Sequence, residues 1–111
     1  MFDKVFDYDL DENIAGGTSL QGYVETTFDN LVNIFGDPNV EDGDKTTVEW
    51  HLSIMADTEQ QGHPTENVVA TIYDWKTTTT PMGKYRWHVG GTSPLAVECV
   101  QEILDGNQEE F

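Results

Sequence analysis

Three of the five basic residues of the chain lie close together, at Lys76, Lys84 and Arg86, and His88 follows two positions later. Lysine and arginine hold phosphate through charge-assisted hydrogen bonds, and arginine can make two parallel ones. The chain also carries 21 acidic residues and a net charge of −16. Against that background, this cluster predicts a site for a small anion.

The segment after His88 adds backbone donors to this prediction. Gly90 and Gly91 are expected to end a strand, and Thr92 or Ser93 to cap the helix that follows. A glycine pair before a helix N-terminus presents N–H groups and the positive end of the helix dipole. Such a turn can also be a plain connection, and that alternative stays open. With two aromatic residues for stacking a base, the predicted ligand site comprises Lys76, Lys84, Arg86, His88, Gly90, Gly91, Thr92, Ser93, Tyr73 and Trp75.

A second set of residues could support hydrolysis. If the last three strands form a meander, one sheet face gathers Glu49, His51, Arg86 and His88. A general base, or a metal site of two histidines and one carboxylate, could then form. These residues come from separate strands, and the chain has no H-x-H, H-E-x-x-H, G-x-S-x-G, P-loop or C-x-x-C motif. The sequence therefore favours a non-enzymatic protein with no catalytic residue, metal ligand or cofactor.

The spacing of apolar residues predicts which elements position these side chains. Strands are expected over 18–25, 45–55, 67–77 and 84–89, and helices over 26–35 and from 94 to the residue before Gly106. Bulky residues on both faces of the 67–77 strand indicate a central position. The order β-α-β-β-β-α is an α+β fold with an antiparallel sheet. Two short helices cannot cover both faces of four strands, so we expect both on one face.

Length and composition limit the domain organisation. A chain of 111 residues suits one domain. We expect an acidic extended N-terminal arm over 1–17, a single α+β domain over 18–105 and an acidic C-terminal tail over 106–111. No apolar run of membrane-spanning length and no secretory signal is present, and Cys99 is expected as a reduced core thiol. These features predict a cytoplasmic protein.

The acidity limits the partners. A protein this acidic repels a polyanion over most of its surface, so direct binding of nucleic acid is not expected. A membrane partner is not expected either, because no apolar run is long enough to span a membrane. The acids can serve solubility in high salt, imitate DNA, or coexist with one small basic pocket. Few helices and three tryptophans leave apolar area for a second copy to cover, which predicts a homodimer or higher homo-oligomer.

Four sequence blocks carry a resemblance to known proteins. They are FGDP (35–38), DKTTVEW (44–50), ATIYDWK (70–76) and WHVGG (87–91). In this order they resemble a family of small proteins encoded by bacteriophages, over residues 18–104. The resemblance implies a phage origin and location in the host cytoplasm. Small phage proteins without enzymatic motifs often act against host defence.

These observations lead to three functional hypotheses. The preferred one is a counter-defence protein that sequesters a small anionic, nucleotide-type immune signal of the host. The alternative is an acidic DNA mimic that blocks a defence protein by direct binding, in the manner of an anti-CRISPR protein. The third is a phosphodiesterase-like hydrolase.

Overall fold

The structure, a computed structural model, describes residues 2–10, 17–41, 45–58 and 66–108. It contains six strands and two helices within these ranges. The strands are β1 (Phe2–Leu10), β2 (Ser19–Thr26), β3 (Val40–Glu41), β4 (Val48–Thr58), β5 (Glu66–Tyr73) and β6 (Tyr85–Gly91). The helices are α1 (Phe28–Phe35) and α2 (Leu95–Gln108).

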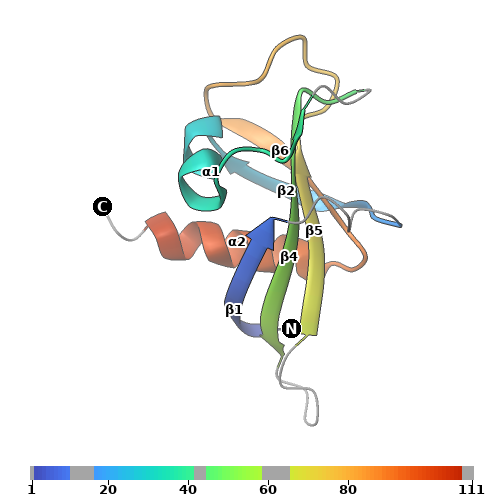
Figure 1. Cartoon of the computed structure of the whole chain (residues 1–111), viewed down its shortest axis with the longest axis vertical. Helices are drawn as coiled ribbons and strands as arrows, with labels where there is room; N and C mark the ends of the chain where they lie inside the picture. Colours follow the sequence, from blue (N-terminus) through green and yellow to red (C-terminus); the bar gives the residue numbers. More distant parts are fainter. Residues whose placement is uncertain (1, 11–16, 42–44, 59–65, 109–111) are drawn as a thin grey trace.

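The strands form one antiparallel sheet in the order β1-β4-β5-β6-β2, and β3 pairs with β4 beside β1. The predicted meander is confirmed, because β5 lies between β4 and β6 and pairs with both. Both helices lie on one face of the sheet, and Figure 1 shows them on the same side of β4 and β5. The α+β class and the single helical layer are therefore confirmed. The other face of the sheet carries no helix among the described elements.

Two tryptophans connect the sheet to both ends of α1. Trp50 and Trp87 are fully buried, with ring centroids 5.6 Å apart in an edge-to-face arrangement. Trp50 donates its indole N–H to the carbonyl oxygen of Gly36 at 2.9 Å, just after α1. Trp87 donates to the carbonyl oxygen of Thr26 at 3.1 Å, just before α1. Buried indole N–H groups need such partners, so these bonds also hold α1 against the sheet.

Helix α1 ends at Phe35 as predicted and begins two residues later than the predicted start at residue 26. Thr27 is the N-cap, and its hydroxyl oxygen accepts a hydrogen bond from the N–H of Asn30 at 3.1 Å. Gly36 ends the helix with φ 92°, a left-handed conformation that glycine adopts without a Cβ penalty, and its N–H donates to Val32 O at 2.8 Å. Local sequence determined this helix.

The predicted end of the strand at Gly90 and Gly91 was wrong. Both glycines belong to β6 and pair with β5 on one side and β2 on the other. A Cβ on Gly91 would lie 2.5 Å from the Cβ of Ala96 and 2.8 Å from the carbonyl oxygen of Val69. Glycine is needed here because helix α2 and strand β5 approach the backbone closely, and it forms no turn.

Other boundaries also differ from expectation. The strand predicted over 67–77 ends at Tyr73, and Lys76 has φ 54°, which is incompatible with a strand. Helix α2 continues through Gly106. Residues 2–10 are extended as predicted, but they form edge strand β1 of the sheet. Strand β3 was not predicted, because two residues give no periodic signal. Residues 11–16 and 109–111 of the predicted arm and tail lie outside the described residues.

Candidate functional site

The strand register aligns polar and aromatic side chains across the helix-free face. Glu49 on β4 pairs with Tyr73 on β5, Tyr73 with His88 on β6, and His88 with Tyr23 on β2. The neighbouring row on the same face runs through His51, Thr71 and Gly90. Arg86 lies two residues before His88 on β6 and over the Tyr23 ring, so it shares this face. The predicted gathering of Glu49, His51, Arg86 and His88 on one face is therefore present.

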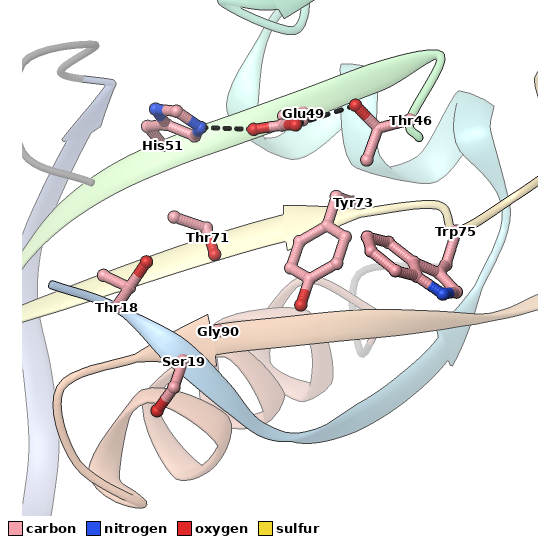
Figure 2. A pocket seen from close by; sticks show the side chains of 9 residues that line it. All are labelled: Thr18, Ser19, Thr46, Glu49, His51, Thr71, Tyr73, Trp75 and Gly90. Carbon is pink, nitrogen blue, oxygen red and sulfur yellow. Dashed lines mark hydrogen bonds and ion pairs between the residues drawn. The ribbon is translucent and has the colours of Figure 1, made fainter. Parts of the chain in front are cut away.

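A cavity of about 220 Å³ opens on this face. Its lining comprises Thr18, Ser19, Thr46, Glu49, His51, Thr71, Tyr73, Trp75 and Gly90 (Figure 2). The hollow depends on Gly90, because a Cβ there would lie 2.6 Å from the hydroxyl oxygen of Thr71. Most of the other lining groups are hydroxyls, which both donate and accept hydrogen bonds.

Glu49 is the carboxylate of this cavity, and both of its oxygens are held. Oε1 lies 2.6 Å from Nε2 of His51, and Oε2 accepts a hydrogen bond from the Thr46 hydroxyl at 2.7 Å (Figure 2). The backbone of His51 is fixed by Asn39, which accepts from the His51 N–H at 2.9 Å and donates to its carbonyl oxygen at 3.3 Å. The carboxylate is thus pre-oriented, with lone pairs left to accept from a ligand.

The centre of the face is aromatic. The Tyr73 and His88 rings are stacked with centroids 5.4 Å apart, and Trp75 lies 6.2 Å from each of them. Burial, and then the Glu49 charge and Tyr23, raise the pKa of Tyr73, so its hydroxyl stays protonated. Burial and the Arg86 charge lower the pKa of His88 more than Asp74 raises it. At neutral pH this centre therefore adds no charge.

Trp75 is positioned by the residue before it. Asp74 is fully buried and accepts hydrogen bonds from the N–H and hydroxyl of Thr47, at 2.8 and 2.7 Å, and from the hydroxyl of Thr77. Burial alone would raise the pKa of Asp74, but these bonds and the N–H of Val48 lower it. The ionised carboxylate thereby anchors the turn that carries Trp75 and Lys76.

The predicted basic cluster is not assembled into one pocket. Lys76 does not line the cavity, but its Nζ lies 5.9 Å from the ring centroid of Trp75, which does. The Arg86 guanidinium lies 4.1 Å from the ring centroid of Tyr23, on the far side of His88 from the cavity. The exposed Lys84 ammonium lies 4.0 Å from a carboxylate oxygen of Glu25.

Of the ten predicted site residues, Tyr73, Trp75 and Gly90 line the cavity. Gly91 is buried and Thr92 is exposed. Ser93 accepts hydrogen bonds from the N–H groups of Leu95 and Ala96 at 3.3 and 3.1 Å, so it caps α2. The turn at 90–93 therefore connects β6 to α2, and the lining does not extend to the residues after Gly90.

Sequence reasoning missed the hydroxyl lining. The adjacent Thr18 and Ser19, together with Thr46 and Thr71, come from three separate segments. Only Thr71, two residues before Tyr73 on the same strand, could be placed on this face from the sequence. His88 lies beyond Tyr73 from the Glu49–His51 pair, and no three His, Cys, Asp or Glu side chains among the described residues approach closely enough to share a metal ion. The metal site of two histidines and one carboxylate that the sequence allowed is not formed by these residues.

Comparisons with known proteins add no family assignment. No protein-family model, curated protein or solved structure matches the chain. Within the described residues, neither helix has the length and apolar character needed to cross a membrane.

Proposed function

We propose that the helix-free face binds and sequesters a small nucleotide-type ligand without transforming it. The observation that carries this proposal is the cavity of about 220 Å³, in which an aromatic wall, a ring of hydroxyls and one oriented carboxylate meet. A nucleoside presents matching groups: a planar base, sugar hydroxyls and N–H donors.

The charges of the site suggest how such a ligand lies. Glu49 repels phosphate and accepts from N–H or O–H donors, so the base or sugar belongs beside it. Trp75 is 43% exposed and offers a ring face for stacking. Lys76, with its Nζ 5.9 Å from the Trp75 ring centroid, is the cation proposed to hold a phosphate. The ligand is therefore proposed to point its phosphate outward.

Sequestration is favoured over hydrolysis by the engagement of the acid–base groups. Both oxygens of Glu49 are already hydrogen-bonded, and one of them holds Nε2 of His51. A protein that holds a nucleotide signal without consuming it fits the counter-defence role that the phage resemblance implies. That origin, and the host target, stay predictions.

Isothermal titration calorimetry with AMP, GMP and the corresponding nucleosides tests this proposal. Trp75→Ala should weaken binding by roughly ten- to hundredfold, since base stacking contributes about 1–3 kcal/mol. Met55→Ala is the matched control, because Met55 is 40% exposed on the same sheet face and does not line the cavity. Lys76→Gln should weaken the binding of nucleotides but not of nucleosides, whereas Lys84→Gln should leave both affinities unchanged.

Two results would overturn the proposal. One is the absence of binding by every mononucleotide and nucleoside. The other is binding that Trp75→Ala leaves unchanged. A protein that binds no nucleotide but captures a basic defence protein would support the DNA-mimic alternative. The exposed acids of α2, Glu98, Glu102 and Asp105, are then the first candidates for charge reversal.

A further inference from the structure

Two exposed aromatic rings lie on the helix-free face, and each contacts a cation. Trp75 is 43% exposed and Tyr23 is 38% exposed. Lys76 Nζ lies 5.9 Å from the Trp75 ring centroid, and the Arg86 guanidinium carbon lies 4.1 Å from that of Tyr23. Each pair combines a stacking surface with a positive charge, which are the two groups that bind one nucleotide unit.

His88 joins the two pairs into a continuous row. Its ring centroid lies 5.0 Å from that of Tyr23 and 6.2 Å from that of Trp75, and it stacks on Tyr73. We name this set the aromatic row: Arg86, Tyr23, His88, Tyr73, Trp75 and Lys76. Because the pKa of His88 is lowered by burial and by Arg86, the middle of the row is neutral and both ends are positive.

A second hollow borders the Tyr23 end of the row. Its volume is about 220 Å³, and it is lined by Tyr23, Val24, Glu25, Arg86 and Gln101. The cavity at the Trp75 end has the same volume. Because Gln101 belongs to α2 and Val24 is buried in the core, this second hollow lies at the outer edge of strand β2. One hollow on the helix-free face and one at its edge therefore lie beside the two pairs of ring and cation.

The distance between the two ends sets the size of the ligand. Tyr23 lies on β2 and Trp75 follows β5, with β6 between those strands. Two strand spacings are about 10 Å, which is more than a single base covers. Neighbouring aromatic side chains on an open sheet face can stack neighbouring, splayed bases of a single strand.

We propose that the ligand is a dinucleotide, with one base in the cavity beside Trp75 and the second beside Tyr23 and Arg86. This inference rests on the proposed function and specifies its ligand. A longer strand is disfavoured because the chain has a net charge of −16, and Glu25 lies opposite Arg86 at the end of the row. Repulsion grows with each phosphate beyond the two cations.

Calorimetry with the dinucleotides ApA and GpG, alongside AMP and GMP, tests this inference. At least one dinucleotide should bind about ten- to hundredfold more tightly than its mononucleotide, with one ligand per chain. Tyr23→Ala and Arg86→Ala should remove that gain and leave mononucleotide affinity unchanged. Leu20→Ala is the matched control, because Leu20 is 47% exposed on the same strand outside the row.

Three results would overturn the dinucleotide inference, and a fourth would overturn the proposed function with it. Equal affinity for mono- and dinucleotides, or a gain that survives Tyr23→Ala and Arg86→Ala in variants with wild-type melting curves, overturns the dinucleotide inference and leaves the proposed function standing. Affinity that keeps rising with longer oligonucleotides also overturns it. If no mononucleotide or dinucleotide binds, both the inference and the proposed function fail.

Discussion

The buried carboxylate of Asp74 is predicted to be a major source of stability. It accepts three short hydrogen bonds, from the N–H of Thr47, the hydroxyl of Thr47 and the hydroxyl of Thr77, and a longer one from Val48 N at 3.4 Å. Bonds to a charged group contribute about 1.5–3 kcal/mol each and are not additive within one network. Asp74→Ala should therefore cost about 3–5 kcal/mol in free energy of unfolding.

The assay is thermal and urea unfolding of the wild type and the variant. At roughly 4 °C per kcal/mol for a domain of this size, the melting temperature should fall by about 12–20 °C. Asp74→Asn should cost less, because the amide oxygen can still accept from a backbone N–H. Asp37→Ala is the control, since Asp37 is exposed in a loop, and it should melt within about 2 °C of the wild type.

The pH dependence follows from the lowered pKa of Asp74. A carboxyl whose pKa is lower in the folded state stabilises the protein above its unfolded pKa of about 3.9, and this contribution is lost as pH falls through the folded pKa. Stability should therefore fall below about pH 4, and less steeply in Asp74→Asn than in Asp37→Asn. This account of the network would be refuted if stability fell equally steeply below about pH 4 in Asp74→Asn and Asp37→Asn. It would also be refuted if the Asp74→Ala protein melted at the temperature of the wild type.

Three further outcomes are expected. Gly90→Ala should destabilise the sheet by about 1–3 kcal/mol and weaken ligand binding, because its Cβ would lie 2.6 Å from the Thr71 hydroxyl. Gly83→Ala is the control: its Cβ would meet no atom within 4 Å, so stability and ligand affinity should be unchanged in unfolding and calorimetry. The melting temperature should rise with sodium chloride concentration, because the Debye length falls from about 10 Å at 0.1 M to about 3 Å at 1 M and repulsion among the acidic side chains weakens. A melting temperature that does not change with salt would contradict this self-repulsion. The homodimer stays a prediction, which a monomer mass in light scattering would contradict.

Local patterns in the sequence were sufficient for most of the fold. Alternation at Val48, Trp50, Leu52 and Ile54 identified β4, and bulk on both faces placed β5 at the centre of the meander. The caps of α1 are local as well, because Thr27 and Gly36 act within one helical turn of their partners. These features depend on residues a few positions apart, which is the range over which side-chain direction and backbone conformation are determined.

Only the tertiary structure determined which of the candidate residues share a site. Lys76, Lys84 and Arg86 are close in sequence, yet they lie against Trp75, Glu25 and Tyr23 respectively. The cavity instead combines hydroxyls from segments far apart in the chain, and it exists because Gly90 has no side chain beside Thr71. Register between strands and the close approach of α2 to β6 are long-range packing events, and no local spacing in the sequence encodes them.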